Sequence, residues 1–148
     1  MHMFHDALVS FAERRVIHMN IFSILIPKHT LTYLNANDTL DQAVAFLLGT
    51  TYTAIPVVDD QGRYVGIASE GDFLRAVMEH GRENLAKYKV EDIVNKDEGA
   101  KVLNTVEKDE IMERILDRNF LCVVDDRDCF IGIITRKSII LYLKNWYV

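Results

Sequence analysis

The chain has 148 residues, of which 49% are hydrophobic and 26% are charged, and its formal net charge is −5. These values are typical of a folded soluble domain, and the acidic balance argues against general binding to nucleic acid or to an anionic membrane surface. Cys122 and Cys129 are the two cysteines, and neither a CxxC motif nor a flanking histidine pair accompanies them. We therefore predict no metal site and no disulfide framework, and we expect a reducing, cytoplasmic location.

Residues 1–20 are predicted to form an extension that precedes the repeated part of the chain. Phe4, Leu8 and Phe11 follow helical spacing, which indicates a short amphipathic helix. The charged residues 13–15 interrupt the apolar run that a secretory leader needs, so the extension is not interpreted as a leader.

Residues 21–84 are predicted to form one unit of structure. A short helix is expected over residues 21–26, ended by Pro27, and a short strand is expected over residues 31–34. The polar run 37–39 can cap a following helix, which ends at Gly49. An apolar strand from Tyr52, a turn over residues 60–63, a second apolar strand and a helix over residues 70–79 complete the unit. The positions expected to face inward in the two longer helices are Leu40, Ala43, Val44, Leu47, Leu48, Phe73, Leu74 and Val77.

Residues 85–148 are predicted to form a second unit with the same order of elements. A polar connector leads to a short helix over residues 90–94 and a short strand at Val102 and Leu103. The remaining elements are a helix with Ile111, Met112, Ile115 and Leu116 facing inward, two apolar strands that begin at Phe120 and Phe130, and a helix over residues 136–146.

The second unit repeats the first at an offset of about 66 residues. The matched segments are Val57-Val58-Asp59-Asp60 with Val123-Val124-Asp125-Asp126, Gly66-Ile67 with Gly132-Ile133, and Ser69 with Thr135. Because both copies keep the same internal order, we interpret the chain as one unit duplicated in tandem.

Two such units, with Ala-Ile-Pro-Val-Val-Asp at residues 54–59 and Gly-Ile-x-Ser-x-x-Asp at residues 66–72, resemble the CBS domain pair. The resemblance covers residues 21–146. It implies an α/β fold in which two β-α-β-β-α units are related by a pseudo-twofold axis, with two clefts for adenosine-containing nucleotides. It also implies a homodimer, for which Phe73, Val77, Ile140 and Trp146 are the apolar positions to examine.

Tyr-Thr-Ala-Ile-Pro at residues 52–56 and Thr-Arg-Lys at residues 135–137 resemble one subgroup of this family more narrowly. These are small stand-alone CBS proteins of Gram-positive bacteria that bind cyclic di-AMP. The narrower resemblance implies the same ligand for this chain.

The resemblance implies that each cleft joins a strand start of one unit to a helix start of the other. The first cleft would then contain Thr32, Tyr52, Thr53, Ala54, Thr135, Arg136, Lys137 and Ser138. An aromatic ring beside small residues suits a purine base, and a hydroxyl, a guanidinium and a helix N-terminus suit a phosphate. The alternative interpretation, which we favour less, makes Tyr52 and Thr53 strand residues at a core boundary and Arg136 and Lys137 a solvated first turn.

The second cleft would contain Ser69, Asp72, Asn119 and Phe120. By resemblance, Asp72 takes the place of the aspartate that binds ribose hydroxyls, although an ordinary acid in the first turn of a helix explains it as well. Glu70 stands where Arg136 stands in the other unit, and a carboxylate repels phosphate. Ser138 replaces the ribose-binding aspartate in the first cleft, which argues against plain AMP or ATP selectivity.

No catalytic motif of the GxSxG, P-loop or HExxH type occurs, so we do not expect an enzyme. The pairs Asp59-Asp60 and Asp125-Asp126 are better explained by turn chemistry than by acid–base catalysis. The predicted function is a regulatory module that binds an adenine nucleotide, with cyclic di-AMP favoured, needs no other cofactor and signals to a partner protein. The alternatives are a regulator that binds AMP or ATP and a scaffold protein without a ligand.

Overall fold

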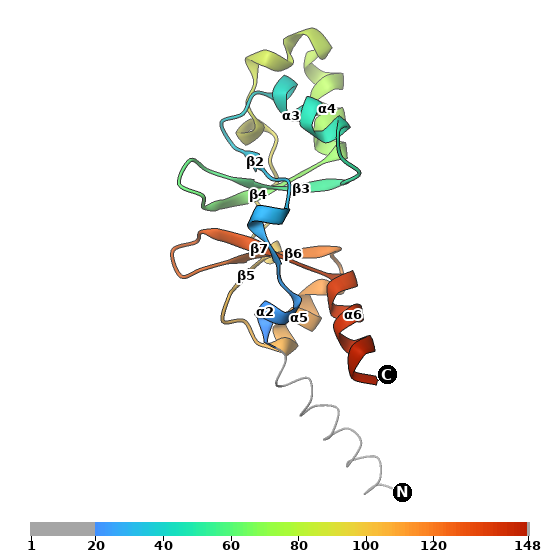
Figure 1. Ribbon diagram of the computed structural model, residues 1–148. Coiled ribbons are helices and arrows are strands. Elements are labelled where there is room, and N and C mark those ends of the chain that lie inside the picture. The colour runs from blue at the N-terminus through green and yellow to red at the C-terminus, as the bar shows by residue number, and fades with distance from the viewer. Residues whose placement is uncertain (1–19, 148) are drawn as a thin grey trace, which may run out of the picture.

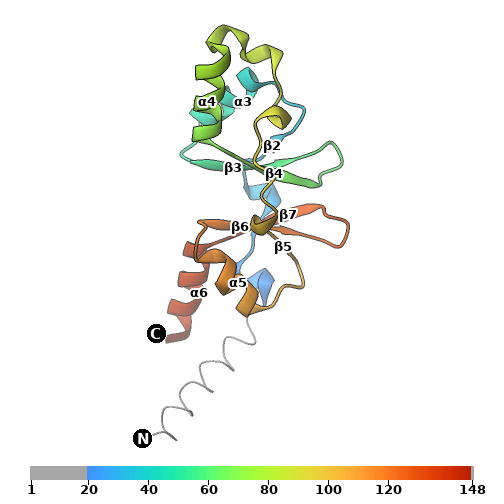
Figure 2. The ribbon, with the colours of Figure 1, turned by 180° about the vertical axis from the view of Figure 1, so that it is seen from behind.

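The computed structural model describes residues 20–147, so the helix predicted within residues 1–19 lies outside the described residues. Figure 1 and Figure 2 show two halves stacked end to end, each with a small sheet and a layer of helices. The two sheets face each other at the centre of the molecule, and the helices cover their outer faces. The fold is therefore the predicted α/β arrangement with two related units.

The elements follow the order that the repeat predicts. Over residues 21–80 they are α2 (Ile21–Ile24), β1 (Ile26–Pro27), η1 (Lys28–Thr30), β2 (Leu34–Asn35), α3 (Leu40–Leu48), β3 (Ala54–Val58), β4 (Tyr64–Ser69) and α4 (Glu70–His80). Over residues 82–147 they are η2 (Arg82–Lys87), η3 (Val90–Asp92), η4 (Glu98–Ala100), β5 (Lys101–Leu103), α5 (Lys108–Ile115), β6 (Phe120–Val124), β7 (Phe130–Thr135) and α6 (Arg136–Tyr147).

The sheets repeat each other in strand register. One sheet has the order β2-β3-β4 and the other has the order β1-β7-β6-β5. Ala54 pairs with Ser69 in the first, and Phe120 pairs with Thr135 in the second, so both registers agree with a 66-residue offset. Arg63 forms an isolated antiparallel bridge with Cys129, its own counterpart, where the two hairpin turns meet. This contact between equivalent residues lies on the pseudo-twofold axis.

The segment that begins each half packs on the core of the other half. Ile21 and Ile24 lie in the hydrophobic cluster of the second half, and β1 pairs with β7. Leu85 and Val90 lie in the cluster of the first half. The divisions 21–84 and 85–148 thus describe the duplication in the sequence, whereas each hydrophobic core draws on both segments.

Some sequence expectations were wrong in detail. The strand predicted over residues 31–34 begins only at Leu34, because a 3-10 turn with a hydrogen bond from Leu31 N to Lys28 O occupies the preceding residues. Leu48, Leu74 and Leu116 were predicted to face inward, but their exposed fractions are 82%, 63% and 70%. Leu48 is the last residue of α3, Leu116 follows the last residue of α5, and the residues that α4 buries are Phe73 and Ala76 rather than Leu74.

Candidate functional site

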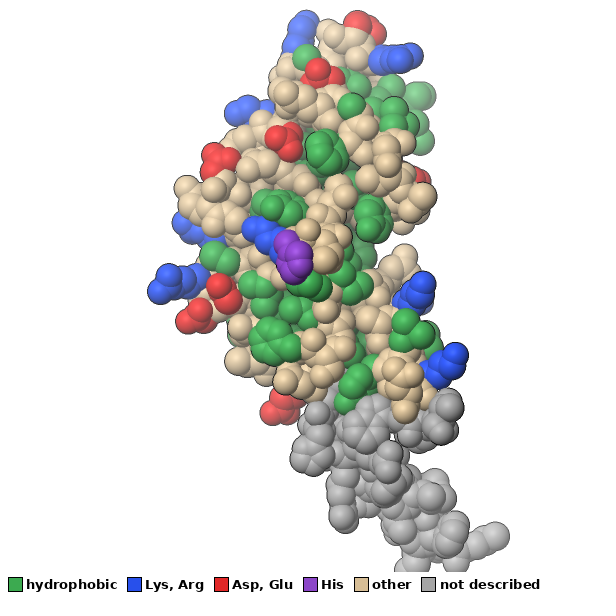
Figure 3. All heavy atoms as spheres, in the orientation of Figure 1, with side chains coloured by type: hydrophobic (Ala, Val, Ile, Leu, Met, Phe, Trp, Pro, Cys, Tyr) green, Lys and Arg blue, Asp and Glu red, His purple; other side chains and the backbone are tan. Residues whose placement is uncertain are grey.

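A cavity of about 240 Å³ lies between the two halves, at the end of the sheets where β3 and β6 begin. Figure 3 shows the surface indented at the right-hand side, at the level where the halves meet. The residues that line the cavity are Leu31, Thr32, Thr51, Tyr52, Thr53, Ala54, Pro56, Asn119, Phe120, Ile133 and Thr135. Five of the eight residues predicted for the first cleft are therefore brought together.

Strand pairing explains why both halves reach this cavity. Ala54 at the start of β3 pairs with Ser69 at the end of β4, and Phe120 at the start of β6 pairs with Thr135 at the end of β7. Each half therefore presents a strand start and a strand end at the same edge. Because the sheets face each other, these edges form opposite walls of one cavity.

The cavity wall combines aromatic rings with small neutral polar groups. Tyr52 from the first half is 44% exposed, and Phe120 from the second half is partly buried. Among the described residues, the side chains of Tyr52, Thr32 and Asn119 have no hydrogen-bond partner in the protein. None of the described residues that line the cavity has a charged side chain. Such a wall suits a planar, uncharged ring that stacks on an aromatic side chain and is read by a few hydrogen bonds.

Asn119 and Phe120 were predicted for the second cleft, and the structure places them in this cavity instead. The reason is the antiparallel pairing of Phe120 with Thr135, which holds the start of β6 beside the helix start assigned to the first cleft. Pairing the two apolar strands of the second unit in the sequence, with Phe120 opposite Thr135, could have predicted this position. The lining residues Leu31, Thr51, Pro56 and Ile133 were not predicted, because they carry no distinctive chemistry.

Arg136, Lys137 and Ser138 do not line the cavity. Arg136 instead donates hydrogen bonds to the carbonyl oxygens of Ile115, at 3.1 Å from Nε, and of Leu116, from Nη2. These carbonyl groups end α5, where a cation also interacts favourably with the helix dipole. The Ser138 hydroxyl accepts a hydrogen bond from Thr135 N at 3.0 Å and caps α6, whereas Lys137 is exposed.

Ser69 and Asp72 form a helix cap, as the simpler interpretation of Asp72 predicted. The Asp72 carboxylate accepts hydrogen bonds from Ser69 N and Ser69 Oγ, both at 2.9 Å, and lies 2.7 Å from Arg75 Nη2. Its oxygen atoms are therefore engaged within the first turn of α4. Neither residue lines the cavity beside Tyr52.

Residues 20–147 carry neither a candidate metal site nor a candidate membrane span. These residues contain no group of three or more His, Cys, Asp or Glu side chains arranged to hold a metal ion. No helix in the same part of the chain has the length and apolar character needed to cross a bilayer. Both cysteines are free thiols, and burial raises the pKa of Cys122, which holds that thiol in its protonated form.

Comparison with known proteins identifies the architecture. The family model of the CBS domain matches residues 23–79 and again residues 90–145. Cyclic di-AMP receptor B of Bacillus subtilis (strain 168) is 24% identical over 144 residues, which cover 93% of this chain and 95% of that protein.

Two solved structures show the same arrangement of elements. A CBS domain protein from Streptococcus pneumoniae TIGR4 superposes with a TM-score of 0.84 at 29% identity, covering 96% of this chain and 98% of that one. The CbpB protein of Listeria monocytogenes, solved in complex with c-di-AMP, superposes with a TM-score of 0.77 at 24% identity, covering 87% and 98%. With its two matched segments and its repeated sheets, the chain belongs to the CBS domain family and carries a tandem pair of these domains.

Proposed function

We propose that this protein is a regulatory module that binds cyclic di-AMP in the cavity between Tyr52 and Phe120. The observation that carries the proposal is a cavity with aromatic and neutral polar walls, formed jointly by the two halves of a CBS pair. Two relatives support the proposal. The Bacillus subtilis protein is named a cyclic di-AMP receptor, and the Listeria protein was solved with this ligand.

The adenine ring is the part of the ligand that the cavity suits. The ring of Tyr52 offers a stacking surface, and base–aromatic stacking contributes about 1–3 kcal/mol per base. The hydroxyl groups of Thr32 and Thr53 and the amide of Asn119 offer hydrogen bonds, since none of these side chains has a partner among the described residues. Neutral partners are appropriate, because adenine itself is uncharged.

The phosphate groups belong outside the cavity. Its volume of about 240 Å³ is smaller than the roughly 300–1,000 Å³ of pockets that enclose a drug-sized ligand. Thr135 on the cavity wall directly precedes α6, so a phosphate that leaves the cavity there meets the first turn of that helix. Exposed Lys137, with its side chain and its backbone N–H, and the guanidinium of Arg136 supply positive charge there, whereas the N–H groups of Arg136 and Ser138 already donate to Asn119 O and Thr135 Oγ1. Ser138 is assigned to the helix cap rather than to the ligand.

A ligand held by both halves would act as a link between them. Tyr52 comes from one half and Phe120 from the other. A base that contacts both residues therefore stabilises the arrangement in which the two halves lie close together at the cavity. A partner protein that recognises this arrangement would then respond to the nucleotide through a population shift, without any chemical reaction. We place the protein in the cytoplasm, because its two unpaired thiols fit a reducing compartment.

We further propose a homodimer through α4 and α6, which lie on the same side of the molecule in Figure 1. Leu74 and Met78 on α4 and Ile140 on α6 are 63%, 80% and 63% exposed, which is unusual for large apolar side chains arranged along one side. Of the positions expected from the sequence, Ile140 remains in this surface, Val77 is partly buried against the core, and the side chain of Trp146 lies outside the described part of the chain. Phe73 is 4% exposed and belongs to the core instead.

The test is calorimetric titration of the full chain with cyclic di-AMP, AMP, ATP and adenosine. Cyclic di-AMP is expected to bind most tightly and to raise the melting temperature, because a ligand selective for the folded state stabilises it by mass action. Tighter binding of AMP or ATP would support the alternative of an adenylate-responsive regulator. Binding of none of these compounds would support the scaffold alternative.

A further inference from the structure

The repeat places a different residue type at the equivalent position of each cleft. Because Ala54–Ser69 and Phe120–Thr135 are equivalent strand pairs, the starts of β3 and β6 are equivalent at an offset of 66 residues, and we count back two residues from each start. Tyr52 on the cavity wall therefore corresponds to Arg118. By the repeat, a second cleft would therefore have a guanidinium group where the first has a phenol ring.

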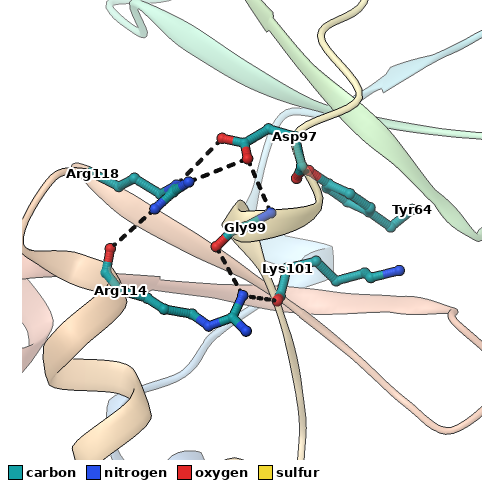
Figure 4. Close-up of polar contacts among 6 residues, drawn as sticks. All are labelled: Tyr64, Asp97, Gly99, Lys101, Arg114 and Arg118. Carbon is teal, nitrogen blue, oxygen red and sulfur yellow. Dashed lines mark hydrogen bonds and ion pairs between the residues drawn. The ribbon is translucent and has the colours of Figure 1, made fainter.

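Arg118 is held in place by Asp97, as Figure 4 shows. Its Nε lies 3.3 Å from Asp97 Oδ2 and its Nη2 lies 3.2 Å from Oδ1, which is a two-point contact between guanidinium and carboxylate. Arg118 Nη1 also approaches the carbonyl oxygen of Arg114 at 3.5 Å. Both side chains are about 30% exposed, so this pair is partly desolvated and stronger than a pair on the open surface.

The guanidinium fills the space beside the backbone at Gly99. A Cβ atom added to Gly99 would lie 2.5 Å from Arg118 Nη2, so the guanidinium would have to shift to admit a methyl group there. The amide of Gly99 donates to Asp97 Oδ1 at 3.0 Å and completes the set of groups around the carboxylate. The residue pair and this backbone turn form one packed unit.

Asp97 also connects this unit to the other half of the molecule. Its carbonyl oxygen accepts a hydrogen bond of 2.8 Å from the hydroxyl of Tyr64, which lies on β4 and is 6% exposed. Burial raises the pKa of Tyr64, so the phenol remains a donor. Arg118 belongs to the second unit and Tyr64 to the first, so Asp97 connects the two units through its carboxylate and its carbonyl oxygen.

The neighbouring cations in Figure 4 are engaged as well. Lys101 Nζ lies 2.9 Å from Glu98 and 3.0 Å from Asp128, and hydrogen bonds to these carboxylates raise the pKa of Lys101. Arg114 contacts Glu110 at 2.8 Å. An incoming phosphate would have to displace one of these carboxylates from its cation, whereas Lys137 beside the first cleft makes no ion pair with any described residue.

We propose that the Asp97–Arg118 ion pair closes the second cleft, so that each chain binds one nucleotide, in the cavity beside Tyr52. This proposal rests on the proposed function, because it specifies how many ligands the module accepts. Arg118 does not serve as a phosphate ligand, because releasing it would leave the Asp97 carboxylate without its cation in a partly buried position.

The test is the number of AMP molecules bound per full-length chain, measured by calorimetry at saturating AMP. AMP is used because each molecule occupies a single adenine subsite. Wild type is expected to bind one AMP. The double variant Asp97→Ala with Arg118→Tyr, which removes the ion pair and restores the tyrosine of the first cleft, is expected to bind two.

Two AMP molecules on wild type, or one on a double variant that still melts cooperatively, would overturn the proposal. If the double variant does not fold, Asp97→Asn removes the charge with little change of shape and should likewise admit a second, weaker AMP. A wild type that binds no nucleotide would overturn the proposed function instead. In that case, a double variant that binds one AMP would still support the closing role of the ion pair. A double variant that binds no AMP would overturn it.

Discussion

Replacement of Tyr52 by alanine should remove much of the affinity for nucleotide and leave the fold intact. The Tyr52 side chain is 44% exposed, lines the cavity and has no hydrogen-bond partner among the described residues. Its loss should therefore change the free energy of unfolding by no more than about 0.5 kcal/mol. A base stacked on an aromatic side chain contributes about 1–3 kcal/mol, which corresponds to an increase in Kd of about 5- to 140-fold.

Calorimetric titration with cyclic di-AMP at 25 °C measures this change directly. Tyr52→Phe keeps the ring and should retain most of the affinity, because the stacking surface is unchanged. Phe46→Ala is a matched control: Phe46 is a 60% exposed aromatic residue on α3 that does not line the cavity, so its loss should not alter binding. A Kd for Tyr52→Ala within about threefold of wild type would refute the stacking role. An equal loss in Tyr52→Phe would assign the contribution to the hydroxyl group.

Three further predictions concern stability and assembly. Tyr64→Phe should cost about 1 kcal/mol at neutral pH through its lost hydrogen bond. Burial raises the pKa of Tyr64 in the folded state, so above pH 10.0 the unfolded chain loses the phenol proton while the folded chain keeps it. Wild type should therefore lose stability as the pH rises above this value. Urea unfolding should show a smaller alkaline loss of stability in Tyr64→Phe, which has no such proton. Gly132→Ala should cost about 1–3 kcal/mol in the same assay, because the new Cβ would lie 2.3 Å from a carbonyl oxygen of the crossing segment, whereas Gly71→Ala on open α4 should be neutral or stabilising. Light scattering should give twice the 17.0 kDa chain mass for wild type and the single mass for Leu74→Glu with Met78→Glu, and an unchanged mass would exclude this surface as the interface.

The order of elements and the duplication could be predicted from the sequence because their signals are local. Caps and turn residues mark the ends of helices, as the capping box at Thr39 and the positive-φ Gly81 after α4 show. A repeat can also be found by comparing the sequence with itself, without any knowledge of tertiary contacts. These signals establish the fold class, and with the family resemblance they indicate which strand ends form the cavity.

Contacts between segments that are distant in sequence could not be predicted in the same way. The sequence presents Arg136 as a free cation at a helix start, but its partners are carbonyl groups 20 and 21 residues away at the end of α5. The Asp97–Arg118 ion pair likewise joins residues 21 apart. An apolar pattern predicts that residues 21–24 are buried but does not identify the core that receives them. The partner of each of these groups depends on how the two halves stack.

The exchange of the opening segments leads to a last prediction: neither half should fold alone. A fragment of residues 85–148 lacks Ile21 and Ile24, which are 7% and 3% exposed in its hydrophobic cluster, and it also lacks the pairing of β1 with β7. Burial of two isoleucine side chains contributes about 3–6 kcal/mol, a large part of the roughly 5–15 kcal/mol that stabilises a whole domain.

The fragment of residues 20–84 has the reciprocal defect, because Leu85 and Val90 belong to its cluster. Chains of this length are marginal even with a complete core. Each fragment should therefore show no cooperative thermal transition by circular dichroism, and an equimolar mixture should recover one. Cooperative melting of residues 85–148 alone would show that the opening segment is dispensable, and the halves would then be independent domains rather than parts of one exchanged core.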